Sequence, residues 1–112
     1  MDKIIQINTT FSRREDAIRA AKLLVEKSLA GCVQIVGPIV SIYRWKGEVE
    51  TEEEWLCLIK STETLFKHVE EAIKSVHPYE VPEIVAIPII SGSKEYLDWL
   101  HGSLEKERSN NK

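Results

Sequence analysis

The stretch CVQIVGPIVSIYRWKGEVETEEEWLCLIKS, residues 32–61, decides the fold. Its β-branched residues and its extended pattern predict two long strands, Cys32 to Trp45 and Glu48 to Ser61. Lys46-Gly47 lies between them and predicts a tight hairpin turn. Because proline cannot donate to a strand ladder, Gly37-Pro38 predicts a bulge or bend inside the first strand. The chain is therefore expected to be built around one long antiparallel hairpin.

A helix is predicted on each side of this hairpin. Upstream, a strand from Lys3 to Thr9 precedes a helix that begins at the capping box Ser12 to Glu15. Downstream, Thr62 or Thr64 is expected to cap a second helix. The apolar positions at helical spacing are Ala17, Ile18, Ala21, Leu24 and Val25 in the first helix, and Leu65, Val69, Ala72, Ile73 and Val76 in the second. A strand from Ile84 to Ile90 and a short helix from Ser93 through Leu100 complete the expected elements.

The resulting order, β-α-β-β-α-β plus a terminal helix, predicts an α+β fold. It is the order of the ferredoxin-like sandwich, an antiparallel sheet with two helices on one face. A chain of 112 residues, 43% of them hydrophobic, suffices for one core without disulfides or metals as staples. We expect a single domain over residues 1–104 and a polar, frayed tail over residues 105–112.

Bulk properties exclude several classes of function. The 15 basic and 18 acidic residues give a net charge of −3, which offers no electrostatic basis for binding nucleic acid. No apolar run approaches the ~20 residues of a membrane span. Met1 to Ile5 lacks the basic start of a signal peptide, so we expect a cytoplasmic protein. Cys32 and Cys57 are then expected to be reduced, buried thiols, and the alternative is a disulfide if the fold brings them together.

The sheet is predicted to be apolar on both faces, although two helices cover only one. Residues 55–59 and 84–90 are apolar at both parities of the strand. Such a face is larger than monomers usually leave exposed, and the long hairpin adds bare strand edges. We expect a further copy of the chain to cover this face. The alternative is that the C-terminal helix folds under the sheet and covers it.

The loop from His77 to Glu83, HPYEVPE, carries the most chemistry. Its two prolines fix a short backbone that presents an imidazole, a phenol and carboxylates. His77 and Glu80 are candidates for a transition-metal site or an acid–base pair. The alternative is a rigid loop whose side chains bond each other at a subunit seam.

Other chemistry-bearing residues have plainer interpretations. His68 and His101 are expected on the surface, since neither has a partner at metal-ligand spacing. The run Glu48, Glu50, Glu52, Glu53 and Glu54 predicts a solvated edge rather than a cation cage. Tyr43, Trp45 and Trp55 are expected to be packing anchors. No nucleophile elbow, phosphate loop or anion-binding glycine loop is present, so we expect no enzymatic activity.

Five segments in order resemble CutA, the divalent-cation-tolerance protein family, and they cover nearly the whole chain. They are residues 29–35 (LAGCVQI), 41–47 (SIYRWKG), 59–61 (IKS), 77–83 (HPYEVPE) and 96–100 (YLDWL). The resemblance implies a ferredoxin-like homotrimer in the cytoplasm that is associated with tolerance to copper and other divalent metals. It implies no obligatory cofactor, and Cu²⁺ or another divalent cation as a ligand.

The resemblance carries over to the site only in part. Copper binding in a similar bacterial member involves a cysteine just after the first strand and two adjacent histidines before the Pro-Tyr. Here the first position falls in Thr9-Thr10, and the paired histidines become Val76-His77, so only His77 matches. Gln34 stands where the family usually has asparagine.

We therefore expect a site in a subunit cleft, with His77 as the metal ligand. Tyr79 and Glu80 are expected beside it, Lys60 as the partner of a small anionic effector, and aromatic walls from Tyr43, Trp45 and Trp99. Three functions stay open: a metal-binding module, a small-molecule signalling trimer like the PII proteins, and a structural assembly protein without an intrinsic metal site.

Overall fold

The computed structural model describes the backbone of residues 2–110 and the side chains of residues 2–105. The chain runs through β1 (Ile4–Phe11), α1 (Arg14–Glu26), β2 (Cys32–Trp45), β3 (Glu48–Thr62), a 3₁₀ turn (Glu63–Leu65), α2 (Phe66–Val76), β4 (Val85–Pro88) and α3 (Lys94–Asn110). The predicted order of strands and helices is confirmed. The sheet has the order β2-β3-β1-β4, with every neighbouring pair antiparallel.

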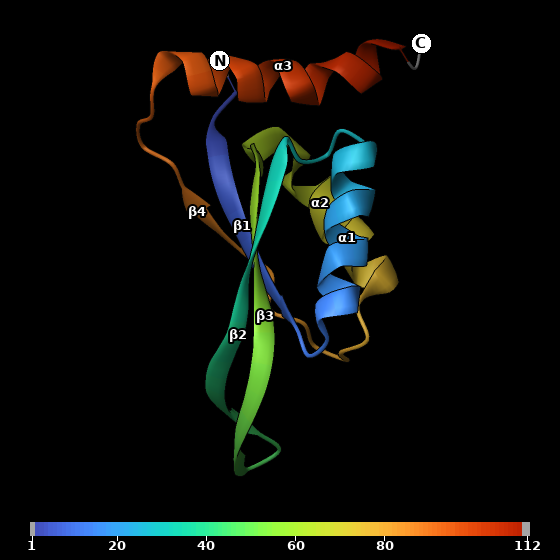
Figure 1. Ribbon diagram of the computed structural model, residues 1–112, viewed down its shortest axis with the longest axis vertical. Helices are drawn as coiled ribbons and strands as arrows, with labels where there is room; N and C mark the ends of the chain where they lie inside the picture. The colour runs from blue at the N-terminus through green and yellow to red at the C-terminus, as the bar shows by residue number, and fades with distance from the viewer. Residues whose placement is uncertain (1, 111–112) are drawn as a thin grey trace.

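The core lies between the sheet and the two helices α1 and α2 (Figure 1). Ile5, Ile7 and Phe11 of β1 point toward these helices, as do Cys57 and Ile59 of β3, and all are buried. Alternation along a strand sends the residues between them to the opposite side. Both thiols are free. Cys32 pairs with Lys60 in the register, so it lies on the opposite face from Cys57. Burial raises the pKa of the Cys57 thiol to about 11.

The hairpin of β2 and β3 is the longest feature of the molecule and is built as predicted. Lys46 and Gly47 both have positive φ, 51° and 83°, which is the geometry of a tight hairpin turn. The register shifts between Val36 and Ile39, which confirms the bulge at Gly37-Pro38. A Cβ on Gly37 would lie 2.6 Å from Cδ1 of Trp55, so this position admits only glycine without rearrangement.

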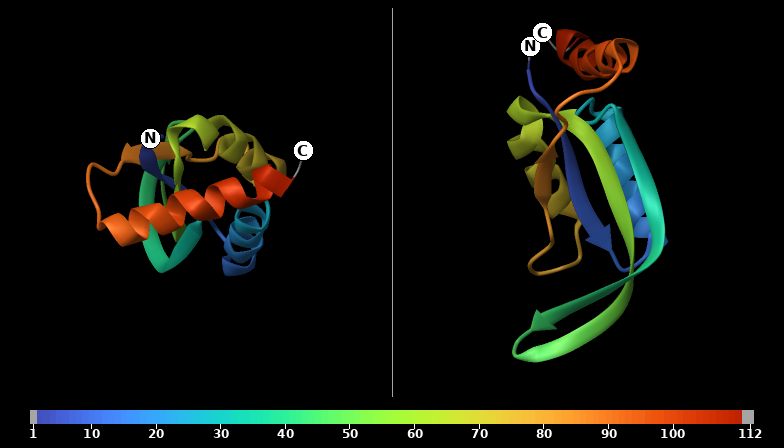
Figure 2. Two further views of the ribbon diagram at one scale, coloured as in Figure 1. Left: turned by 90° about the horizontal axis from the view of Figure 1, so that it is seen from above. Right: turned by 90° about the vertical axis from the view of Figure 1, so that its left-hand side faces the viewer.

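The far half of the hairpin, residues 39–54, extends beyond the rest of the sheet. The register of β1 with β3 ends at Phe11 and Trp55, so these residues pair only with each other (Figure 1). We call this segment the arm. Figure 2 shows it curving back toward the loop that joins α2 to β4.

The sheet face opposite α1 and α2 is only partly apolar, and we call it the open face. Val36, Val85 and Ile87 lie there with 45–47% of their surface exposed. Leu56 and Leu58 lie there half-buried, and Gln6 of β1 donates to Asn8, which is paired with Leu58. The helix α3 crosses the end of the sheet instead of its face (Figures 1 and 2), so the C-terminal helix leaves the open face uncovered.

Several predicted boundaries are wrong. The N-cap of α1 is Arg13 with no side-chain capping bond, because β1 continues to Phe11 and delays the helix beyond Ser12. Neither Thr62 nor Thr64 caps α2, since a 3₁₀ turn precedes it. The last strand spans only Val85–Pro88. The helix α3 continues past Leu100 to Asn110, because the side chains of Leu100 and Leu104 are both buried. Residues 111–112 of the predicted tail lie outside the described residues.

No helix among residues 2–110 combines the length and the apolar character needed to span a membrane.

Candidate functional site

His77 is held by the backbone through both of its ring nitrogens. Its Nε2 lies 2.7 Å from the carbonyl oxygen of Thr10, and the amide of Tyr79 donates to its Nδ1 at 3.2 Å. Because Nδ1 accepts, Nε2 carries the proton of a neutral ring. The ring also stacks on Phe11 with centroids 4.2 Å apart. To bind a metal, His77 would have to give up one of these two bonds.

Tyr79 joins the loop to the arm. Its hydroxyl donates to Oε2 of Glu54 at 2.6 Å, and only 5% of the surface of Glu54 is exposed. Burial and the adjacent carboxylate raise the pKa of Tyr79, so the phenol keeps its proton. The Tyr79 and His77 rings lie 4.7 Å apart. An unbroken series of contacts therefore links the core to the Glu54 carboxylate, running from Phe11 through His77 and Tyr79.

A cleft of about 690 Å³ opens between the arm and the loop 77–83. Its acidic lining comes from Glu50, Glu52 and Glu54 on β3 and from Glu80 and Glu83 on the loop. The described lining residues include no lysine, arginine or histidine. The remaining lining residues are Thr10, Ser41, Ile42, Tyr43, Trp45, Tyr79 and Val81. Carboxylates gathered in a concave surface create a local negative potential that favours cations over anions.

Four of the predicted site residues line this cleft, namely Tyr43, Trp45, Tyr79 and Glu80. His77 lies behind it and holds the loop. Lys60 lies elsewhere on the open face and donates to Gln34 at 3.0 Å. Trp99 lies on α3, with its ring 5.6 Å from that of Tyr96. The structure thus does not bring Lys60 and Trp99 together with the other candidates.

Sequence reasoning missed Thr10 and Glu54. The interpretation of the acidic run as a solvated edge is wrong for Glu54, which is buried against Tyr79. The available signal was the spacing of Glu50, Glu52 and Glu54, since alternate residues of a strand share one face. Trp55 packs against the core as expected, whereas Tyr43 and Trp45 each keep 38% of their surface exposed.

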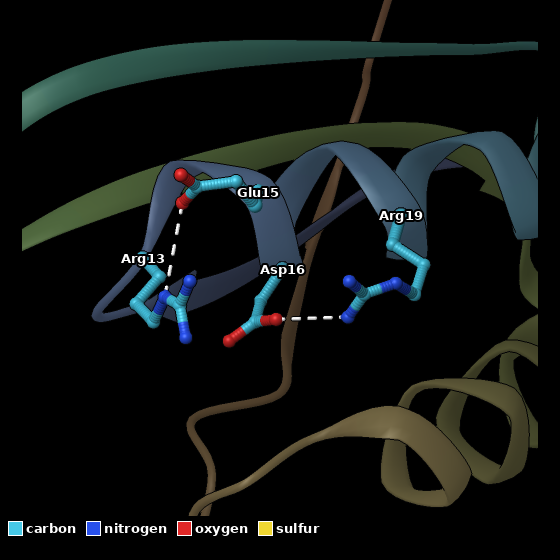
Figure 3. A network of polar contacts seen from close by, with 4 residues as sticks. All are labelled: Arg13, Glu15, Asp16 and Arg19. Carbon is cyan, nitrogen blue, oxygen red and sulfur yellow. Dashed lines mark hydrogen bonds and ion pairs between the residues drawn. The ribbon is translucent and has the colours of Figure 1, made fainter.

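Two arginines near the start of α1, Arg13 and Arg19, pair with acidic neighbours (Figure 3). Arg13 lies 3.8 Å from Glu15, and Arg19 lies 2.9 Å from Asp16. These exposed pairs contribute little to stability.

Among the described residues, no three His, Cys, Asp or Glu side chains converge as a metal site would require. The prediction that His77 binds metal stays a prediction.

The environment of His77 predicts a pH-dependent stability. Burial lowers the pKa of His77 below its usual value, and this outweighs the opposing effects of the Thr10 carbonyl, Glu54 and Asp16. The neutral ring thus contributes stability that is complete above a pH of about 6.5 and is lost as the pH falls through the lowered pKa. We expect His77→Phe to lose about 1–3 kcal/mol at pH 8 by leaving two backbone groups unpaired. We also expect the free energy of unfolding of this variant to fall less than that of wild type when the pH is lowered from 7.5 to 5. Urea unfolding at matched protein concentration measures both, and equal losses on acidification would contradict the assignment.

Comparison with known proteins agrees with this architecture. Residues 5–103 match the family model described as "CutA1 divalent ion tolerance protein". A divalent-cation tolerance protein CutA of Thermus thermophilus is 50% identical over 100 residues, which cover 89% of this chain and 95% of that protein. A chloroplastic protein CutA of Arabidopsis thaliana is 39% identical over 99 residues, and this chain spans only 54% of its length.

Solved structures show the same fold. A Thermus thermophilus structure, titled a divalent cation tolerance protein, matches with a TM-score of 0.85 at 49% identity and covers 87% of this chain and 94% of its own. The Archaeoglobus fulgidus structure, titled a periplasmic divalent cation tolerance protein CutA, matches with a TM-score of 0.88 at 40% identity and covers 90% and 98%. Since these names include chloroplastic and periplasmic forms, a cytoplasmic location for this chain stays a prediction. With a family model matched over most of its length and relatives up to 50% identical, the chain belongs to the CutA1 divalent ion tolerance protein family.

Proposed function

We propose that this chain is a non-enzymatic binding module that assembles as a homotrimer and takes up a cation in the cleft between the arm and the loop 77–83. One observation carries the proposal: a cleft lined by five carboxylates, with no basic side chain among its described lining residues. It requires no obligatory cofactor. Copper and other divalent cations are the first ligands to test, because relatives are named for divalent-cation tolerance.

Glu54 is the residue in this cleft that most needs a positive partner. Its carboxylate is almost fully buried and receives one hydrogen bond from Tyr79. Among the ion pairs of residues 2–105, none includes Glu54. A buried charge without a counter-charge is costly, and a bound cation would offset that cost.

Assembly supports the same function. The cleft and the open face lie on the same side of the sheet, since Thr10 is paired with Leu56 and Glu54 lies two residues before Leu56 on the same strand. Val36, Val85 and Ile87 leave apolar surface there that a second copy would cover. Because one chain does not supply three converging metal ligands among its described residues, a neighbouring copy would complete a metal's coordination. The number of three copies is the one that the family resemblance implies.

The test is calorimetric titration of the full chain with Cu²⁺ and with Mg²⁺. Glu54→Gln keeps an oxygen acceptor for Tyr79 but removes the charge, so we expect it to weaken cation binding roughly tenfold or more. Glu53→Gln is the matched control, because Glu53 precedes Glu54 on the opposite face of β3 and does not line the cleft. We expect Glu53→Gln to bind as wild type does.

Equal affinities for wild type and Glu54→Gln would contradict the cleft as the cation site. Binding of no cation would favour a purely structural assembly.

A further inference from the structure

The carboxylates of β3 are arranged as a ladder. Glu50, Glu52 and Glu54 lie on one face of the strand, and alternate residues of an extended strand are about 7 Å apart. A single metal ion needs its oxygen ligands at roughly 2.0–2.6 Å, which requires carboxylates to converge. The described residues contain no such convergence. These separate carboxylates are instead complementary to a ligand that carries several separate positive charges along a chain.

The deep end of the cleft offers unused hydrogen-bond acceptors. Thr10 lines the cleft with only 6% of its surface exposed, and its hydroxyl forms no hydrogen bond with any described residue. It lies on the same face as Glu54, whose carboxylate uses Oε2 for the Tyr79 phenol. A primary ammonium carries three N–H donors and would satisfy both side chains.

The outer end of the cleft is aromatic. Tyr43 and Trp45 line it and keep 38% of their surface exposed. The ammonium of Lys46 already lies 5.7 Å from the centroid of the Trp45 ring. This contact shows that the indole accepts an alkylammonium, as the negative face of an aromatic ring does. Methylene groups of a ligand would also gain apolar contact here.

We propose that the cleft binds a linear aliphatic polyamine. One terminal ammonium is held by Glu54 and Thr10 and the next by Glu52, and the third ammonium of a longer polyamine is held by Glu50, across from Tyr43. The two ammonium groups of a four-carbon diamine are separated by a distance comparable to one step of the ladder. This inference rests on the proposed function, since it names the cation class that the same cleft takes.

The test is calorimetry of the full chain with 1,4-diaminobutane and spermidine, with 1-aminobutane as the single-charge control. We expect the diamine to bind at least about tenfold more tightly than the monoamine, and spermidine more tightly still. Thr10→Val, which replaces the hydroxyl with a methyl group, is expected to weaken diamine binding several-fold. Tyr43→Leu, across from Glu50, is expected to weaken spermidine binding more than diamine binding. Glu53→Gln is again the matched control and is expected to bind the diamine as wild type does.

The outcomes separate this inference from the proposed function. Binding of Cu²⁺ or Mg²⁺ that depends on Glu54, without binding of the diamine, overturns the polyamine and leaves the proposed function standing. Absence of binding for both kinds of cation overturns both. Equal affinity for the diamine and the monoamine, or a diamine affinity unchanged in Glu54→Gln, also overturns the polyamine. Diamine binding that weakens in Thr10→Val, together with spermidine binding that weakens further in Tyr43→Leu, supports it.

Discussion

Phe11→Ala is expected to lower the free energy of unfolding by about 3–5 kcal/mol, as large aromatic truncations in cores do. Phe11 is fully buried in the core cluster, and its ring also stacks on the His77 ring with the ring centroids 4.2 Å apart. The substitution therefore leaves a cavity at the point where the core meets the loop 77–83. Urea unfolding monitored by tryptophan fluorescence, at matched protein concentration, measures the loss.

The same substitution is expected to loosen the cleft. Because His77 positions the Tyr79 amide and Tyr79 positions Glu54, a free His77 ring weakens the whole series of contacts. Val25→Ala is the control, since Val25 is 44% exposed on α1, away from the arm and the open face, and its truncation should cost less than about 0.5 kcal/mol. A loss below about 1 kcal/mol for Phe11→Ala would contradict the role assigned to its ring.

Ile87→Glu is expected to convert the assembled protein into monomers. Ile87 lies on β4 at the open face with 47% of its surface exposed, and a carboxylate there would be buried unpaired in any interface that covers this face. Light scattering after size-exclusion chromatography is expected to give the mass of three chains for wild type. For the variant we expect the 12.8 kDa of one chain.

Val25→Glu is the matched control for assembly. Val25 lies on α1 with a similar exposure, 44%, but away from the open face. We expect this variant to keep the wild-type mass, and circular dichroism would verify that both variants are folded. A wild-type protein that runs as a monomer, or an Ile87→Glu variant that keeps the full mass, would exclude the open face as the interface.

Periodicity predicted the elements well because their causes are local. The hairpin follows from β-branched residues on either side of Lys46-Gly47, and the bulge follows from one proline. The ends of elements depend on distant contacts, and this is where the predictions failed. The length of α3 is an example. The helix extends over Leu104 because that side chain is buried in the folded chain, and the local sequence pattern does not reveal this burial.

The grouping of the candidate residues in one chain was predictable in part for the same reason. A loop such as His77 to Glu83 reveals its chemistry in a short window, so Tyr79 and Glu80 could be expected to lie together. Lys60 lies apart from the cleft within one chain, because spacing along a strand gives the face of a residue but not its position relative to a loop from another part of the chain. Glu54 was missed because its burial depends on Tyr79, which lies 25 residues away.

The arm has a consequence for how binding and assembly depend on each other. One wall of the cleft, the loop 77–83, is anchored to the core through Phe11 and His77, whereas the other wall is a two-stranded ribbon with no third strand beside it. Isolated ribbons of this kind are only marginally stable, so in the proposed trimer a neighbour packed on the arm would set the width of the cleft. The two equilibria are then thermodynamically linked. A ligand that favours one width of the cleft strengthens subunit association by a certain factor. Subunit association then strengthens the binding of that ligand by the same factor.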